Sequence, residues 1–272
     1  MRSAAVLVFG STLFAAVSIS PGYPAYERAN ALFAAQKFPE SAAAIEEALR
    51  LDPNLVPALT LKAKMAMAAN QYHLAEQCLE RALAVDPKAG YAQFLYGLEA
   101  YLSNDMQEAL PRFQKARRIN PRDPHAALYL GLTSESLGQT GEAMRLYEEA
   151  VSLETSAGDL HADTLLPGVR LLLLLGRLEE SERWARHAVT LSPRSRDAHF
   201  ELARVLLKRD DAAGAASEGE SALILSDGVV GDPAIHYLLI RAWQRNGMPD
   251  RAAFHAAVMR AQETSANSKA KE

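Results

Sequence analysis

Small and bulky apolar residues recur along this chain at fixed positions of a 34-residue period. Alanines stand at 48, 82, 116 and 150, each 34 residues after the one before, and the first three precede a proline by five residues. Ala188 and Pro193 repeat this pair after a shift in phase. A fixed period of this size indicates stacked helical units rather than one globular core.

The pattern predicts seven units, each a pair of helices joined by a short turn. Position 20 is small in every unit and position 8 is small in most, so the two helices can approach closely where these positions meet. Glycine or asparagine, which tolerate the left-handed conformation that ends a helix, stands near position 15 in five units. These residues are Asn70, Asn104, Gly138, Gly176 and Gly247. The units begin near Gly22, Val56, Gly90, Pro124, Ala162, Arg196 and Pro233, and the array covers residues 22–262.

This arrangement resembles the tetratricopeptide repeat (TPR) family, whose unit has small residues at positions 8, 20 and 27, bulky ones at 4, 7, 11 and 24, and proline at 32. The resemblance implies an all-α fold, a right-handed α-solenoid of about seven helix-turn-helix units. Two insertions interrupt the period, one between Leu153 and Ala162 and one near Val229 to Asp232. Pro167 and Gly168 predict a late or kinked start of the first helix of unit five, and Gly219 at position 24 is a poor core filler.

In this family the first helices line a concave groove, and their positions 2, 5, 9 and 12 point into it. Here the middle of the groove is apolar and aromatic, and its C-terminal half carries one arginine per unit. Such residues anchor many protein interfaces, although any one of them could instead pack between helices. A ligand with an apolar segment followed by acidic groups would match. The groove residues implied are Tyr91, Phe94, Leu98, Tyr101, Leu128, Leu132, Arg170, Phe200, Arg204, Tyr237 and Arg241.

A chaperone-binding subset of the family grips a C-terminal carboxylate with lysines and asparagines at set groove positions. Asn30 and Lys64 stand at position 9 of the first two units, but Tyr26 and Thr60 stand at position 5. The matching lysine and second asparagine are absent, so the resemblance does not extend to this clamp.

The two ends of the chain depart from the repeat pattern. Residues 1–20 combine Arg2, an interrupted apolar run from Ala4 to Val17 and small residues before a break at Pro21, which is typical of a cleaved signal peptide. An uncleaved membrane anchor and a cytoplasmic start are the alternatives, although the run is short for a span. Residues 263–272 are polar and unpatterned, and we expect a disordered tail.

Composition and charge narrow the function classes. The net charge of −4 and pI of about 6.0 give no general attraction to nucleic acid. One basic cluster on unit three could still be a nucleic-acid or acidic-lipid patch, or a solvated face balanced by neighbouring acids. It comprises Arg112, Lys115, Arg117, Arg118 and Arg122. The single cysteine, Cys78, excludes an internal disulfide framework, and we expect it to be a core residue.

No residue pattern points to catalysis. The seven histidines are scattered, and the sequence has no zinc-protease helix, no glycine-rich phosphate loop and no nucleophile elbow. We therefore expect no enzymatic activity, no cofactor and no metal.

The sequence predicts a non-enzymatic, monomeric scaffold or adaptor that holds an extended or helical segment of another protein in its groove. The leader places it in the periplasm or outside the cell, with an inner-membrane anchor as the alternative, and no membrane span remains in the mature chain. The rival hypotheses are an accessory or assembly subunit of an envelope secretion, pilus or polysaccharide-export machine, a cytoplasmic regulatory module, and a self-assembling structural protein.

Overall fold

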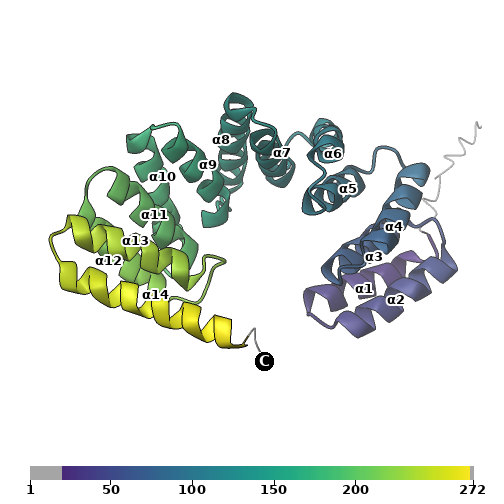
Figure 1. Ribbon diagram of the computed structural model, residues 1–272. Coiled ribbons are helices and arrows are strands. Elements are labelled where there is room, and N and C mark those ends of the chain that lie inside the picture. The colour runs from purple at the N-terminus through teal and green to yellow at the C-terminus, as the bar shows by residue number, and fades with distance from the viewer. Residues whose placement is uncertain (1–19, 270–272) are drawn as a thin grey trace, which may run out of the picture. The chain divides into compact units, whose positions relative to one another are not determined.

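The computed structural model describes residues 20–269, and these form fourteen α-helices in seven consecutive pairs (Figure 1). The predicted all-α fold is thereby confirmed. The first helices of the pairs begin within one residue of the expected unit starts. The helices are α1 (Tyr23–Ala34), α2 (Phe38–Leu51), α3 (Val56–Ala68), α4 (Tyr72–Val85), α5 (Gly90–Leu102), α6 (Met106–Ile119), α7 (Pro124–Ser136), α8 (Thr140–Ala157), α9 (Ala162–Leu174), α10 (Leu178–Leu191), α11 (Arg196–Lys208), α12 (Ala212–Ile224), α13 (Asp232–Arg245) and α14 (Pro249–Lys269).

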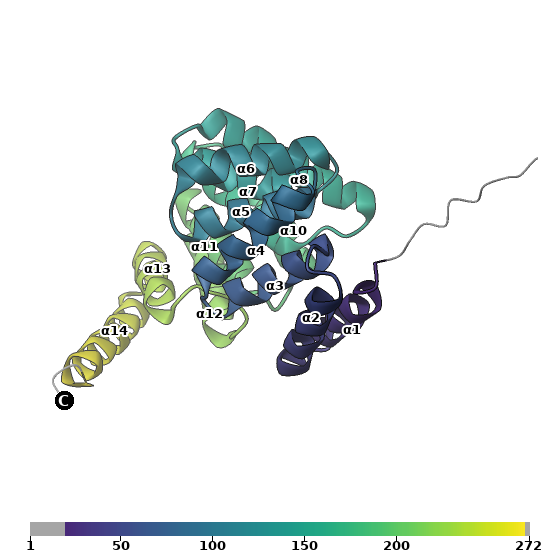
Figure 2. The same ribbon diagram turned by 90° about the vertical axis from the view of Figure 1, so that its right-hand side faces the viewer.

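The seven repeats fall into two larger compact parts of the chain, which are called unit 1 and unit 2 from here on. The boundary between them lies within α5, after Leu95. In unit 1, α1 packs on α2 and α3, and α3 packs on α4. In unit 2, each helix from α6 to α14 packs on the next, and α11 also touches α9 and α13. The first helices of the last three pairs therefore lie side by side (Figure 1). Helices α13 and α14 form the final pair, at the C-terminal end of the described chain (Figures 1 and 2).

Left-handed residues end the first helix of every pair. Each of the five glycines and asparagines expected to do so has a positive φ, from 56° at Asn70 to 77° at Gly138. In the other two pairs Gln36 (φ 59°) and Asp210 (φ 63°) take this role, which the sequence did not predict. The second helices α2, α4, α6 and α10 end two residues before the prolines at 53, 87, 121 and 193.

The two helices of a pair meet at small residues, as expected. Ser41 donates a hydrogen bond from its hydroxyl to the carbonyl of Ala29 (2.8 Å), which joins positions 20 and 8 of the first pair. Ser181 makes the same bond to Val169 in the fifth pair (2.9 Å). Because both serines are fully buried, these bonds satisfy hydroxyls that have no access to water.

Aromatic rings of second helices lie directly on glycines of first helices. A Cβ atom at Gly97 would stand 2.8 Å from the ring of Phe113, and one at Gly131 would stand 2.7 Å from the ring of Tyr147. In the fifth pair both members are one position earlier, since a Cβ at Gly168 would stand 2.3 Å from the Trp184 ring. Gly168 therefore serves as the contact that position 8 makes elsewhere.

Two expectations differ from the structure, and the first insertion extends a helix. Helix α9 begins at Ala162 and contains Pro167 in its interior, so its start is not delayed. Most of the first insertion lengthens α8, which ends at the left-handed Gly158. Residues 263–269, expected in a disordered tail, continue α14, because no glycine or proline follows Pro249.

The second insertion forms an ordered loop between α12 and α13. Asp197 of α11 accepts hydrogen bonds from the backbone N–H groups of Val229 (3.0 Å) and Val230 (2.9 Å). The N–H of Arg196 donates to the carbonyl of Asp227 (2.7 Å). These contacts fix the start of α13 against α11, and so help to position the groove helices.

The expected leader lies outside the described residues, apart from Ser20. None of the described helices combines the length and apolar character needed to span a bilayer.

Candidate partner-binding groove

Helices α9, α11 and α13 of unit 2 enclose an open groove of about 520 Å³. Each helix contributes side chains from its groove-facing side at matching positions of its repeat. Five of the predicted residues meet here, namely Arg170, Phe200, Arg204, Tyr237 and Arg241. The other lining residues are Leu173, Leu174, Leu207, Lys208, Ala234, Leu238 and Arg245.

Position 13 of the repeat lines the groove, although the sequence did not predict it. Three lining residues stand at position 13 of their repeats, at the C-terminal end of the first helix, namely Leu174, Lys208 and Arg245. A cation recurs at this position in the last two repeats, and this recurrence was the signal in the sequence that could have indicated it.

The groove has apolar surface that is open to a partner. Leu174 is 74% exposed and Tyr237 is 57% exposed, whereas Leu207 and Leu238 form a buried floor. Phe200 is half-buried and packs against the core cluster of α11, α12 and α13. Burial of this apolar surface by a partner would favour binding, and only the surplus over the freedom lost on association would appear as affinity.

Five cationic side chains surround this apolar surface, and one buried acid lies among them. The carboxylate of Glu201 is 2.7 Å from Nη1 of Arg204 and 3.5 Å from Nη1 of Arg170. Glu201 is only 3% exposed, and its burial raises the pKa of its carboxyl despite the two arginines. One carboxylate thus holds arginines from two consecutive first helices.

The remaining cations have different surroundings. Arg245 donates to the carbonyl of Leu207 (2.9 Å) and pairs with Asp210 (3.1 Å). The guanidinium of Arg241 lies 5.9 Å from the ring centroid of Tyr237, within cation–π range. In the described part of the chain, neither Arg241 nor Lys208 makes an ion pair with a carboxylate.

The predicted apolar middle of the groove divides between the two units. Tyr91 and Phe94 lie in unit 1, where their rings stack at 6.1 Å; Tyr91 is 49% exposed, but Phe94 is only 7% exposed and offers little surface to a partner. In unit 2, Leu128 and Leu132 are half-buried against the core around Tyr147. Tyr101 packs edge-on against Tyr129 at 5.7 Å, and burial raises the pKa of its phenol. Leu98 is half-buried.

Unit 1 has a smaller hollow of about 290 Å³ along α1, α3 and the start of α5. The two residues that resemble part of the carboxylate clamp, Asn30 and Lys64, both line it. The ammonium of Lys64 lies 4.8 Å from the ring centroid of Phe33, and the hydroxyl of Thr60 donates to the carbonyl of Val56 (2.6 Å). Its polar groups are therefore partly engaged within the unit.

The repeat geometry agrees with the comparison with known families. The family model described as "Tetratricopeptide repeat" matches residues 60–124, 97–159 and 168–230, which together make up more than half of the chain. The chain belongs to the tetratricopeptide repeat family.

Solved structures show the same fold. A chain of the APC/C hetero-tetramer Cut9–Hcn1 is 17% identical with a TM-score of 0.61; the match covers 85% of this TPR chain but only 44% of that one. TTC0263, a TPR protein of Thermus thermophilus, is 22% identical with a TM-score of 0.55; the match covers 68% of this chain and 99% of TTC0263. YrrB, described as "a TPR protein with an unusual peptide-binding site", is 18% identical (TM-score 0.53, 66% and 90% covered). No curated protein matches the sequence.

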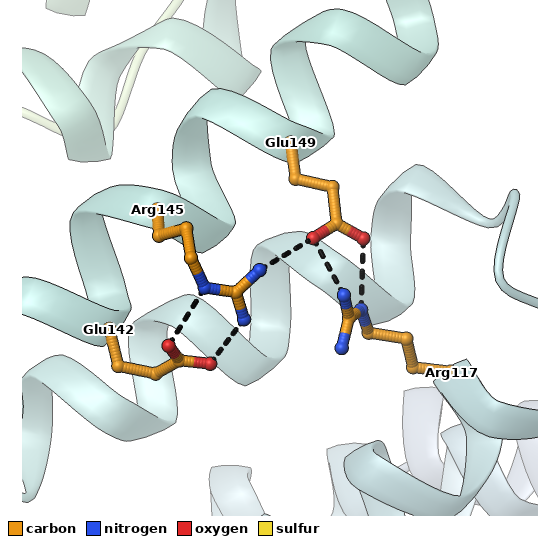
Figure 3. Close-up of polar contacts among 4 residues, drawn as sticks. All are labelled: Arg117, Glu142, Arg145 and Glu149. Atoms are coloured by element: carbon orange, nitrogen blue, oxygen red, sulfur yellow. Dashed lines mark hydrogen bonds and ion pairs between the residues drawn. The ribbon is translucent and has the colours of Figure 1, made fainter.

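The basic cluster on α6 of this TPR protein is partly neutralised. Arg117 forms a two-pronged ion pair with Glu149 (2.9 and 2.7 Å), and Arg145 links Glu149 to Glu142 (Figure 3). The bond from Arg145 lowers the pKa of Glu142. Arg112 pairs with Glu108 at 2.8 Å. These contacts favour the balanced, solvated face over a nucleic-acid patch.

The described residues contain no cluster of three or more histidine, cysteine or acidic side chains arranged to hold a metal ion. Cys78 is buried in α4, and its burial raises the pKa of the thiol, which disfavours a reactive thiolate.

Proposed function

We propose that this chain is a non-enzymatic scaffold that binds a segment of a partner protein in the groove formed by α9, α11 and α13. The observation that carries the proposal is the groove itself, in which three first helices expose apolar, aromatic and arginine side chains together. Aromatic and arginine residues dominate the binding energy of many protein interfaces. The repeated positions of these side chains suit a ligand that extends across successive helices.

A peptide ligand fits this site better than a small molecule. The groove is open, whereas pockets for small ligands usually enclose most of the ligand surface. YrrB, which has the same fold, is described as having a peptide-binding site. Membership of the TPR family also supports a protein partner, because the fold implies protein partners.

We further propose that the protein acts in the cell envelope. The support is the apolar leader at residues 1–20, which has the features of a signal peptide. A cleaved leader would release a periplasmic or secreted scaffold, and an uncleaved one would tether it to the inner membrane.

Site-specific photo-crosslinking in the native cells tests both parts of this proposal. The photoreactive amino acid p-benzoylphenylalanine would replace Leu174 or Tyr237 in the groove, each in a separate full-length variant. The matched control replaces Ile224, which is 85% exposed but lines a different hollow between α12 and α14. We expect a partner to be captured from Leu174 and Tyr237 and not from Ile224. Mass spectrometry of the same samples identifies the N-terminal residue of the mature chain.

Capture from Ile224 alone would show that the groove is not the binding surface and would overturn the proposal. An N-terminus near Ile19 is the expected result for an exported protein. A chain that retains residues 1–17 and is recovered with cytosolic partners would contradict the envelope location.

A further inference from the structure

The cations of the groove are not equally available to a ligand. Arg170 and Arg204 both pair with the buried carboxylate of Glu201, and Arg245 is held by Leu207 and Asp210. With Glu201 and Asp210 counted against the five cations, three positive charges remain uncompensated. The groove is therefore suited to an anionic partner, but the charge that can bind it is concentrated at particular residues.

Glu201 competes with a ligand carboxylate for the two arginines beside it. If a ligand drew Arg170 and Arg204 away, the nearly inaccessible Glu201 carboxylate would lose its partners. Leaving a buried charge unpaired is costly, and this cost opposes the exchange. An incoming carboxylate beside Glu201 would also meet a like charge.

Arg241 and Lys208 are free of this competition. Both line the same groove, and in the described part of the chain no carboxylate pairs with either. The guanidinium of Arg241 lies within cation–π range of the Tyr237 ring, a contact that leaves its N–H groups available to a ligand carboxylate. Apolar surface from Leu174 and Phe200 lies in the same groove.

We propose that the groove recognises a partner segment that carries glutamate or aspartate next to apolar residues, and that it captures the carboxylate at Arg241 and Lys208 while Glu201 keeps Arg170 and Arg204 engaged. This inference rests on the proposed scaffold function and adds the chemistry of the partner. Glu201 is then a specificity-determining residue, because it sets where along the groove a negative charge is bound.

Fluorescence anisotropy with synthetic probes tests the inference on the full-length protein. The probe is a fluorescein-labelled peptide of about twelve residues in which glutamate alternates with leucine and phenylalanine, and it spans about 40 Å when fully extended. The control peptide has glutamine at every glutamate, which keeps the shape and removes the charge. We expect the glutamate probe to bind about tenfold or more tightly than the glutamine probe at low salt, and to lose this advantage above about 0.15 M salt.

Three variants locate the charge that binds. Arg241→Gln is expected to weaken binding of the glutamate probe about three- to tenfold, whereas Arg170→Gln should change it less than about twofold. Glu201→Gln keeps an oxygen that can accept from Arg204 but removes the negative charge, so it should tighten binding about two- to fivefold. Circular dichroism checks that each variant is folded.

Equal affinity for the two peptides, or binding of neither, would overturn the inference. A loss of affinity for the glutamate probe in Arg170→Gln as large as that in Arg241→Gln would also overturn it. Both arginines are exposed, so this comparison remains valid even if Glu201→Gln does not fold. Crosslinking from Leu174 does not depend on the charge of the partner. Capture from Leu174 together with no preference for the glutamate probe would therefore refute this inference and leave the scaffold function intact.

Discussion

Replacing Tyr147 with alanine is expected to lower the free energy of unfolding of unit 2 by about 3–5 kcal/mol, the usual cost of removing a large buried aromatic ring. Tyr147 has no exposed surface, and its ring packs against Met144, Leu171 and Leu172. Its hydroxyl donates to Glu135 at 2.5 Å. The variant would lose the contact between α7, α8 and α9 at the point where two repeats join.

The effect of Gly131→Ala on the free energy of unfolding is expected to depend on whether Tyr147 is present. In the natural protein the new Cβ would stand 2.7 Å from the Tyr147 ring, which cannot move because it is buried and bonded to Glu135. We expect a loss of about 1–3 kcal/mol from this overpacking. With Tyr147→Ala already present the ring is gone, and the higher helix propensity of alanine should make Gly131→Ala neutral or stabilising by up to about 1 kcal/mol.

Urea unfolding followed by circular dichroism measures these free energies, and hydrogen exchange of α7 and α8 locates the loss, since repeat arrays need not unfold in one step. Gly141→Ala is the matched control: Gly141 is also helical, but a Cβ there meets nothing within 4 Å. That control should leave stability unchanged or slightly raised. Equal effects of Gly131→Ala in both backgrounds would show that the ring does not require the glycine.

The packing of α14 on α13 is expected to weaken as the pH falls below about 6.5, the ordinary pKa of histidine. His236 and His255 are each 5% exposed, and their Nδ1 atoms are 2.9 Å apart, so one ring N–H donates to the other ring nitrogen. Burial, and then the nearby His236, lower the pKa of His255. Glu220 of α12 opposes this shift, while Arg251 of α14 adds to it.

The sign follows from the lowered pKa. Because unfolded His255 takes up its proton at a higher pH than the folded protein, stability is intact above about 6.5 and is lost as the pH falls toward the folded pKa. The slope cannot exceed about 1.4 kcal/mol per pH unit for one proton. Hydrogen exchange of α14, measured between about pH 7.5 and pH 5, should show protection falling in this helix first.

His255→Gln should flatten this pH dependence, since its amide can still hydrogen-bond to His236 but cannot be protonated. His187→Gln, at an exposed position of α10, should leave it unchanged. A pH profile in His255→Gln as steep as in the natural protein would assign the effect to other groups.

The sequence predicted those features that depend on local chemistry. Glycine, asparagine and proline constrain the backbone where they stand, so the turns at Asn70 and Gly138 and the helix ends before the prolines were predictable. Features that depend on neighbouring repeats were not. The space left by Gly219 is filled by Leu238 and Leu239 of the next repeat, with Leu239 Cδ2 within 2.8 Å of where a Cβ would be.

The groove was predicted only in part, because some of its features depend on neighbouring repeats. The predicted arginines and aromatic residues of its C-terminal half do line one groove. The contribution of position 13 was not predicted, because it depends on how far the end of each first helix lies from the next first helix. The ion pair between Arg170 and Glu201 joins α9 to α11, and no spacing within one repeat could indicate it. The burial of Phe94 likewise reflects neighbouring side chains rather than its place in the period.

The shift of the glycine–aromatic contact in the fifth pair bears on how this array could have diverged. Moving the contact from positions 8 and 24 to positions 7 and 23, as Gly168 and Trp184 show, requires two substitutions in different helices. A tryptophan at 184 without a glycine at 168 would collide with the Cβ atom of the residue at 168, and a glycine without the ring would leave a void. Each substitution alone is therefore disfavoured, which couples the residue at 168 to the residue at 184.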